Sequence, residues 1–237
     1  KLCFEGPMEE LSKTVNLQPA VLTVSLAALR KMKAEKGRPD FAAGHSLGEF
    51  GALVAAEVFD EKTALKLVAK RAAIMDEMAG KNPGAMLAVI GLPAEELETI
   101  CELARNEGTV VMANFNTPEQ IVISGASRAV AAAGKYIKMK GGRGIPLPVS
   151  GAFHSELMAD AAKRVAVAIE KVEFNKPICP DLPNAKAKAI DSPAEIKKIL
   201  TEQIVSPDRW TQNVAALDET GGSEYIAASP KANLGTI

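Results

Sequence analysis

Apolar residues along this chain recur at helical spacing in some segments and at strand spacing in others, and the two patterns alternate. A period of about 3.6 residues predicts a helix over residues 19–33 and another over 60–79, which Asp60 caps. Between them, a short apolar run predicts a strand at 41–44, and a second apolar segment predicts a helix at 50–58. Such alternation of helices and strands favours an α/β fold.

The middle of the chain has the pattern of a separate unit. We predict a strand at 85–90, a helix at 94–106, strands at 110–114 and 120–124, a helix at 127–140 and a strand at 144–149. This β-α-β-β-α-β order is typical of the ferredoxin-like split unit. The elements before this unit still lack partners, so they must pair with the elements after it. These are a helix at 155–171, a short strand near Ile178 and a helix at 194–204.

We therefore expect an α/β fold with two parts. An α/β-hydrolase-like catalytic core with a mostly parallel sheet would span residues 1–82 and 149–237, and the ferredoxin-like subdomain at 83–148 would be inserted in it.

Composition narrows the class of protein. The chain has 237 residues, 47% of them hydrophobic and 4% aromatic, with a formal net charge of −1, which argues against nucleic acid or a membrane surface as a partner. Cys3, Cys101 and Cys179 are isolated and odd in number, which predicts reduced thiols in a cytoplasmic compartment. An organellar location stays open if a targeting segment precedes Lys1. Two histidines and no C-x-x-C pair predict that there is no metal site.

The segment Gly44-His45-Ser46-Leu47-Gly48 has the G-x-S-x-G spacing of a nucleophile elbow and stands between a predicted strand and a predicted helix. The chain must turn sharply at Ser46, and we expect a side chain at position 44 or 48 to collide with neighbouring backbone. The serine hydroxyl would then stand at a helix N-terminus, where free N–H groups favour a developing oxyanion. The alternative is a glycine-bounded turn with a capping serine.

A serine hydroxyl needs a base to act as a nucleophile at neutral pH. His45 is adjacent to Ser46, so its side chain diverges from the serine, and we expect it to pack beside the turn. His154 comes after a predicted strand, at the kind of strand end where open parallel sheets form ligand sites. We therefore predict that His154 is the base.

Arg71 falls within the apolar face of the predicted helix at 60–79, whereas Lys66 and Lys70 fall outside it. A charge on a buried face must find a partner, because an unpaired buried charge is costly. Two interpretations stay open from the residues alone. Arg71 forms an internal salt bridge, or its guanidinium binds a substrate carboxylate in a bidentate manner.

Over nearly its whole length the chain resembles the malonyl-CoA:acyl-carrier-protein transacylases and the related acyltransferase domains of fatty-acid and polyketide synthases. The resemblance is carried by an ordered set of motifs: Glu5-Gly6-Pro7, Gln18-Pro19-Ala20, Gly44 to Glu49, Arg71 with Met75, Asn114-Phe115-Asn116, residues 122–125, residues 147–155 and residues 203–210. The ordered set is far more specific than any one of its members.

The resemblance implies a role for each matching residue. Ser46 would carry the malonyl group as an ester, and His154 would act as base and then as acid. The backbone N–H of Leu47 would be an oxyanion donor. Arg71 would hold the malonyl carboxylate, and the main-chain carbonyl of Gln203 would orient the histidine.

The resemblance also implies substrates and partners. Coenzyme A leaves from malonyl-CoA, and the pantetheine thiol of an acyl carrier protein then accepts the malonyl group, with no bound cofactor. Phe153 resembles the malonyl-selecting form of the family, since a bulky side chain there leaves less room for an α-methyl group. We expect Asn114 and Asn116 to contribute to the same pocket, and we expect a monomer.

Two departures from the family pattern stand out. Family members open with a strand and a Pro-Gly-Gln-Gly loop whose glutamine N–H is the second oxyanion donor, and no such loop precedes Glu5 here. We therefore expect either a truncated N-terminus or an oxyanion hole with a single donor. Near the other end, Ser229-Pro230-Lys231 stands where the family shows Gly-Pro-Gly, and the family continues beyond Ile237.

Three alternatives to a free-standing transferase remain. A serine esterase or thioesterase would use the same Ser46–His154 pair on water, although it would have no reason to keep Arg71 in an apolar face. The chain could also be an acyltransferase domain fragment of a polyketide synthase. A non-catalytic module that binds a carrier protein is the third alternative.

Overall fold

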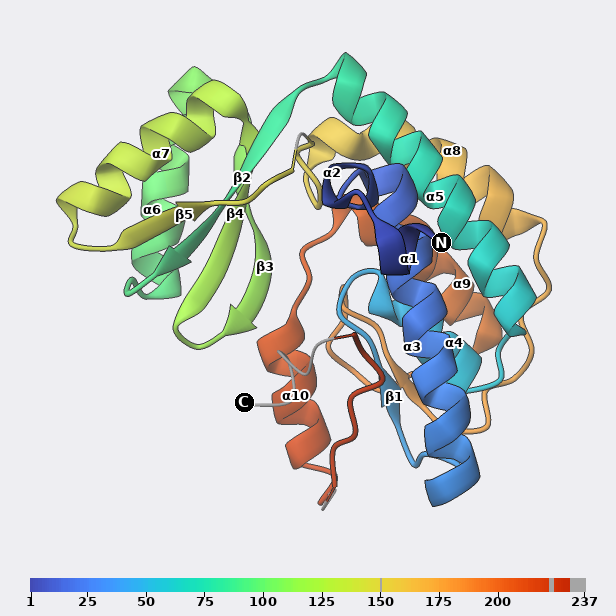
Figure 1. Ribbon diagram of the computed structural model, residues 1–237. Coiled ribbons are helices and arrows are strands. Elements are labelled where there is room, and N and C mark those ends of the chain that lie inside the picture. Colours follow the sequence, from blue (N-terminus) through green and yellow to red (C-terminus); the bar gives the residue numbers. More distant parts are fainter. Residues whose placement is uncertain (150, 222–223, 231–237) are drawn as a thin grey trace.

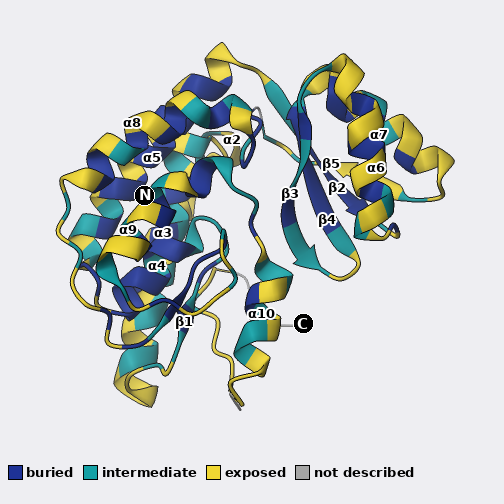
Figure 2. Cartoon of the chain, turned by 180° about the vertical axis from the view of Figure 1, so that it is seen from behind, coloured by how far each residue is buried: buried dark blue, intermediate teal, exposed yellow. Residues whose placement is uncertain are grey.

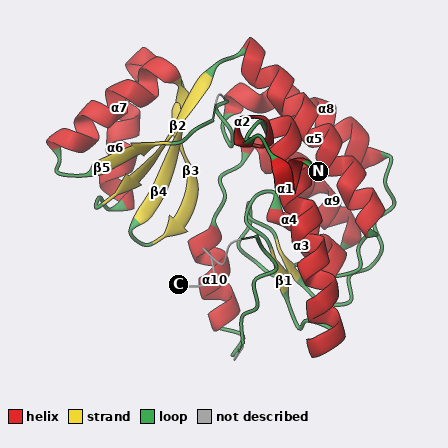
Figure 3. Ribbon diagram, viewed as in Figure 1, coloured by secondary structure: helices red, strands yellow, loops and turns green. Residues whose placement is uncertain are grey.

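The structure is a computed structural model that describes residues 1–149, 151–221 and 224–230. Within these residues the chain is an α/β protein with two sheets, one parallel and one antiparallel (Figure 1). Helices surround the parallel sheet, whereas the antiparallel sheet extends to one side with two helices against it (Figure 3). No helix among the described residues is both long and apolar enough to cross a membrane.

Helices outnumber strands in the described chain. The helices are α1 Leu2–Glu5, α2 Met8–Leu11, α3 Thr14–Lys36, α4 Gly48–Ala55, α5 Glu61–Lys81, α6 Ala94–Ala104, α7 Ser127–Met139, α8 Ala159–Glu170, α9 Pro193–Glu202 and α10 Trp210–Asp218. Short 3-10 turns span Arg105–Glu107, Glu156–Met158 and Gln203–Val205. The strands are β1 Ala42–Ala43, β2 Gly84–Ile90, β3 Val110–Thr117, β4 Gln120–Ala126, β5 Arg143–Pro146 and β6 Asp181–Leu182.

The parallel sheet is short, and helices provide most of the core around it. Strand β1 pairs with β6 over two residues, Ala42 with Asp181 and Ala43 with Leu182. Apolar side chains of α3, α4, α5, α8 and α9 pack together in one buried cluster. The expected mostly parallel sheet therefore has only two strands in the described residues, and the strand expected near Ile178 lies at β6 instead.

The antiparallel sheet has the strand order β3-β4-β2-β5, and every neighbouring pair is antiparallel. Alternate residues of each strand face opposite sides. Leu87 and Val89 pack against α6 and α7, while Met86 and Ala88 face Phe153 on the other side. The predicted β-α-β-β-α-β element order is present in this segment.

The chain enters and leaves the antiparallel sheet at one place. Pro83 and Gly151 form an isolated antiparallel bridge. A Cβ at Gly84 would lie 2.6 Å from the Cβ of Ala152, so only glycine permits this approach. Between β3 and the segment before α10, the Phe115 N–H donates to the Asp208 carbonyl and the Asp208 N–H donates to the Ala113 carbonyl, both at 2.8 Å. These contacts join the antiparallel sheet to the rest of the molecule.

Most predicted elements exist, but several boundaries differ. Helix α3 begins at Thr14 and passes through Pro19, where the sequence pattern predicts its start. Helix α4 begins at Gly48 and ends at Ala55, and β3 continues to Thr117, where the sequence predicts a turn. Helices α1, α2 and α10 have no predicted counterpart. The first two are four residues long, too short to show a period. Helix α10 buries only Asn213, and much of its surface is coloured as exposed or intermediate (Figure 2).

Candidate active site

Ser46 lies in a sharp turn between β1 and α4. Its φ of 49° is in the left-handed region, which a residue with a side chain occupies at a cost of about 1–3 kcal/mol. A Cβ at Gly44 would lie 2.0 Å from the backbone carbon of Gly48, so the elbow requires glycine at 44. A Cβ at Gly48 would meet nothing within 4 Å, so the collision expected at position 48 is wrong.

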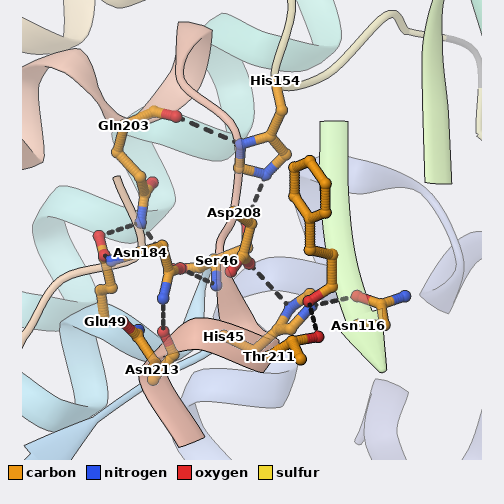
Figure 4. Close-up of polar contacts among 12 residues, drawn as sticks. His45, Ser46, Glu49, Asn116, His154, Asn184, Gln203, Asp208, Thr211 and Asn213 are labelled. Atoms are coloured by element: carbon orange, nitrogen blue, oxygen red, sulfur yellow. Dashed lines mark hydrogen bonds and ion pairs between the residues drawn. The ribbon is translucent and has the colours of Figure 1, made fainter. Parts of the chain in front are cut away.

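His154 meets Ser46 from a distant part of the chain. The Ser46 Oγ and His154 Nε2 atoms are 2.9 Å apart (Figure 4). His154 is buried, and its Nδ1 lies 3.2 Å from the Gln203 carbonyl oxygen and 3.0 Å from that of Ser206. Carbonyl oxygens only accept, so Nδ1 carries the proton and Nε2 is left to accept one from the serine. No sequence pattern indicates the contribution of Ser206.

Burial sets the protonation state of this histidine. Desolvation, followed by the nearby charge of Arg71, lowers the pKa of His154 to about 4, although the two carbonyls oppose the shift. The imidazole is therefore neutral at neutral pH and can accept a proton. The pair matches a nucleophile and its base in distance and in protonation state.

Arg71 reaches the same serine from α5. Its side chain is 2% exposed, and its Nη2 lies 3.4 Å from Ser46 Oγ and 3.1 Å from Gln203 Oε1. Nη1 donates to Gln18 Oε1 at 2.6 Å, whereas Nε is buried without a hydrogen-bond partner. No carboxylate of the described residues lies within salt-bridge distance of this guanidinium. Burial lowers the pKa of Arg71 to about 10, so it is still a cation at neutral pH.

The internal salt bridge that the sequence left open for Arg71 is thus absent from the described part of the chain. A buried cation with an unpartnered donor beside a serine hydroxyl is arranged to receive an anion.

The backbone of Leu47 provides a second hydrogen-bond donor near the serine. Its N–H stands directly before α4 and has no hydrogen-bond partner among the residues that the structure describes, whereas the Gly48 N–H donates to the His45 carbonyl.

His45 points away from Ser46 and packs beside the turn, as expected. Its Nε2 lies 2.8 Å from Asn116 Oδ1 and its Nδ1 3.2 Å from Asp208 Oδ2, and its ring meets that of Trp210 edge-on at 5.7 Å. Burial raises the pKa of Asp208 to about 6, and His45 opposes the shift. Asn116 therefore contacts His45 and not the Ser46–His154 pair (Figure 4).

The remaining predicted pocket residues lie near the site on its antiparallel side. Asn114 is buried on β3, where it forms a backbone bridge with Asp208. Phe153 is half-buried and packs against both the main core and the sheet residues Met86 and Ala88. The polar contacts of the Ser46 hydroxyl are with His154 and Arg71, so a contribution of Asn114 and Phe153 to the pocket stays a prediction.

A cleft of about 690 Å³ lies beside His154. His154 lies in its wall, together with Met112 and Phe115 of β3, and Arg105 and Arg209 also line it. The guanidinium of Arg209 lies over the Phe115 ring at 6.0 Å. Glu98 and Glu156 line the cleft as well, so its wall combines apolar, cationic and anionic side chains.

Several buried polar residues of the site have no counterpart among the predicted residues. Glu49 and Asn184 are 2% and 1% exposed and hydrogen-bond to the elbow or to each other. Glu49 belongs to the Gly44–Glu49 motif, so the sequence does point to it, whereas Asn184 lies in a loop without periodicity.

Among the described residues no group of His, Cys, Asp or Glu is arranged to hold a metal ion. Ser150 and Lys231, which two of the sequence motifs include, lie outside the described residues.

A family model, curated proteins and solved structures that match this chain all describe the same kind of protein. The family model described as acyl transferase domain matches residues 2–236. A malonyl CoA-acyl carrier protein transacylase of Bacillus subtilis is 42% identical over 97% of this chain and 73% of its own length. The solved transacylase of Coxiella burnetii, at 38% identity, has a TM-score of 0.95 over 99% of this chain and 75% of that one. A malonyl-transacylase solved in complex with its type II PKS acyl-carrier protein has 39% identity and a TM-score of 0.94, covering 99% and 76%.

Proposed function

Because the chain belongs to the acyl transferase domain family, we propose that it transfers a malonyl group from malonyl-CoA to the phosphopantetheine thiol of an acyl carrier protein. This is a serine acyltransferase reaction that supplies malonyl units to fatty-acid synthesis. The observation that carries the choice of acyl group is Arg71, a buried cation with no salt-bridge partner in the described chain, 3.4 Å from the hydroxyl of Ser46.

In the first half of the reaction the serine is acylated. His154 Nε2 takes the proton of the Ser46 hydroxyl while Oγ attacks the thioester carbon of malonyl-CoA. The oxyanion that forms is stabilised by the Leu47 N–H. When the intermediate collapses, the C–S bond breaks and the departing thiolate of coenzyme A takes the proton from His154. The malonyl group is then an ester of Ser46.

In the second half the same groups act in reverse. The phosphopantetheine thiol of the carrier protein gives its proton to His154 Nε2 and attacks the ester carbon. The new C–S bond forms, the C–O bond to Ser46 breaks, and Oγ recovers the proton from the imidazole. The carbonyls of Gln203 and Ser206 hold the imidazole in the required tautomer throughout.

Arg71 gives the reaction its selectivity for a carboxylated acyl group. A guanidinium binds a carboxylate with two parallel N–H donors, and Nε of Arg71 is one donor without a partner. Phe153 restricts the pocket beside His154 and disfavours an α-methyl substituent. An esterase or thioesterase would use the same pair on water, but a buried unpaired cation would then have no role. Arg71 therefore favours the transferase over both hydrolases.

The finer description of the fold is also proposed. We infer an α/β-hydrolase-like catalytic core at 1–82 and 149–237 with an inserted ferredoxin-like subdomain at 83–148. The strand order β3-β4-β2-β5 and the bridge between Pro83 and Gly151 support this division. We propose a monomer in a cytoplasmic compartment, in line with its free thiols at Cys3, Cys101 and Cys179.

Intact-mass analysis after brief incubation with malonyl-CoA tests the function. The wild-type chain is expected to gain the mass of one malonyl group, and Ser46→Ala is expected to gain none. Addition of a holo acyl carrier protein should remove the adduct from the enzyme and place it on the carrier. An adduct that persists in Ser46→Ala would rule out this nucleophile, and an adduct lost to water as fast as to the carrier would make the chain a hydrolase.

A further inference from the structure

The backbone leading into Ser46 is held by the buried side chain of Asn184. Its Oδ1 accepts a hydrogen bond from the Ser46 N–H at 2.6 Å, and its Nδ2 donates to the Gly44 carbonyl at 2.7 Å (Figure 4). Asn184 lies two residues after β6, and Ser46 lies three residues after β1. Since β1 and β6 are parallel neighbours, their carboxyl ends bring the asparagine and the serine together.

Asn184 is itself fixed by the carboxylate of Glu49. The Asn184 backbone N–H donates to Glu49 Oε1, and Gln203 Nε2 donates to Glu49 Oε2. Gln203 Nε2 also donates to the Ser46 carbonyl at 2.7 Å. The N–H and the carbonyl of the nucleophile are thus held by two side-chain amides, and both of their residues bind one buried carboxylate.

This arrangement determines where the elbow points its donors. Ser46 has a φ of 49°, which persists only where the surroundings hold it. With the Ser46 N–H occupied by Asn184, the free donor at the elbow is the N–H of Leu47, as far as the described residues show. That N–H must lie within hydrogen-bond distance of the developing oxyanion to act on it.

We propose that Asn184 is a positioning residue for acyl transfer. Its carboxamide fixes the Gly44–Ser46 turn so that Ser46 Oγ faces His154 and the Leu47 N–H faces the oxyanion. The inference rests on the proposed transferase function, because it assigns Asn184 to the same serine. Asn184 touches neither the acyl group nor the imidazole, and it acts through the backbone of the elbow.

Asn213 offers a matched control for this role. It is also buried, at 0% exposed against 1% for Asn184, and its Nδ2 likewise donates to a backbone carbonyl, that of Leu182, at 2.9 Å. This hydrogen bond does not reach the elbow. The two substitutions to alanine therefore remove similar groups from similar surroundings, and only one of them releases the turn at Ser46.

The test measures kcat and KM for malonyl-CoA in Asn184→Ala and Asn213→Ala, with melting temperatures for both. Asn184→Ala is expected to lower kcat by about 10²-fold, the usual effect of a misplaced reacting group, with KM unchanged because Arg71 keeps its contacts. Asn213→Ala is expected to keep the wild-type kcat. Equal kcat values in the two folded variants would overturn the proposal.

Two further measurements test the role of Asn184 if the first variant does not fold or the transferase function fails. If Asn184→Ala does not fold, Asn184→Asp keeps an acceptor for the Ser46 N–H but no donor for the Gly44 carbonyl, and a wild-type kcat there would overturn the role. The second measurement is the rate at which a fluorophosphonate labels Ser46, a reaction in which no acyl-CoA takes part. Slower labelling of Asn184→Ala than of Asn213→Ala supports the role and equal rates overturn it, even if the wild-type chain forms no malonyl adduct and the proposed function fails.

Discussion

The two sheets of this chain are stabilised by different interactions. In the antiparallel sheet, β2 pairs with β4 over its whole length, from Gly84 opposite Ala126 to Ile90 opposite Gln120. The face toward α6 and α7 is a cluster of buried apolar side chains. The parallel sheet pairs only two residues of each strand. Beyond these two residues there is no strand ladder in the described chain, and buried side chains such as that of Asn184 hydrogen-bond to the backbone instead.

The distribution of buried polar residues shows the same contrast. The described antiparallel segment buries only Asn114 and Ser124, whereas the surroundings of the parallel sheet bury Gln18, Glu49, Arg71, His154, Ser155, Asp181, Asn184, Gln203, Asp208 and Asn213. Burying such groups is costly unless each finds a partner. The antiparallel sheet is thus held mainly by apolar packing, whereas near the parallel sheet Glu49, Asn184 and Gln203 add polar contacts that fix the backbone of Ser46. Apolar substitutions in the antiparallel part should therefore change stability without changing the geometry at the serine.

A large loss of stability, without loss of activity, should come from a cavity in the antiparallel part. Ile137 on α7 is fully buried among apolar side chains of that part, away from the cluster that surrounds the site. Ile137→Ala is expected to lower the free energy of unfolding by about 2–5 kcal/mol, since the cavity refills incompletely. Denaturant unfolding measures the loss, and kcat/KM below the melting temperature should stay at the wild-type value.

Leu103, on the neighbouring helix α6, is the control for that substitution because 53% of it is exposed. Leu103→Ala should change the free energy of unfolding by less than about 0.5 kcal/mol. A folded Ile137→Ala enzyme whose kcat/KM falls together with its stability would show that the two sheets are not separable.

A change of stability with pH is expected on the polar side of the molecule. Burial raises the pKa of Asp181 on β6 to about 7, above its value in the unfolded chain. The folded state therefore holds more protons, and the free energy of unfolding falls with rising pH by up to about 1.4 kcal/mol per unit. Asp181→Asn cannot ionise, so its melting temperature relative to wild type should rise from pH 4 to about 7 and then level off.

Ser124→Ala is the matched control from the antiparallel sheet, where the serine is fully buried and cannot ionise near neutral pH. Its melting temperature should run parallel to that of the wild type over the same pH range. Parallel curves for Asp181→Asn as well would mean that the Asp181 carboxyl is not desolvated in solution.

The contrast between the sheets also decides how much of the molecule can be predicted from the sequence. The apolar runs of β2 and β4 and the helical period of α6 and α7 are local patterns, so the elements of that segment are predictable one by one. The elbow is predictable because its two glycines and its serine lie within five consecutive residues. Arg71 is visible because a charge interrupts an apolar period.

Partners that depend on distant contacts are not predictable in this way. Asn184 reaches Ser46 across more than half of the chain from a loop without periodicity. Ser206 orients His154 through its backbone carbonyl, which any residue would supply. Strand β6 is two residues long, too short for a pattern, so the prediction near Ile178 misses it. The collision expected at Gly48 is wrong because its Cβ direction is open, which only the three-dimensional turn determines.

In the proposed reaction, the choice of substrate depends on one interaction, between the buried guanidinium of Arg71 beside the serine and the carboxylate of a malonyl group. A comparison of kcat/KM for malonyl-CoA and acetyl-CoA, in the wild type and in Arg71→Ala, measures it. Loss of a charge-assisted contact is expected to lower the malonyl-to-acetyl ratio by at least about tenfold, or roughly 1.4 kcal/mol, because acetyl has no carboxylate to leave unpaired. Equal losses for both substrates would refute carboxylate binding and make Arg71 a structural residue.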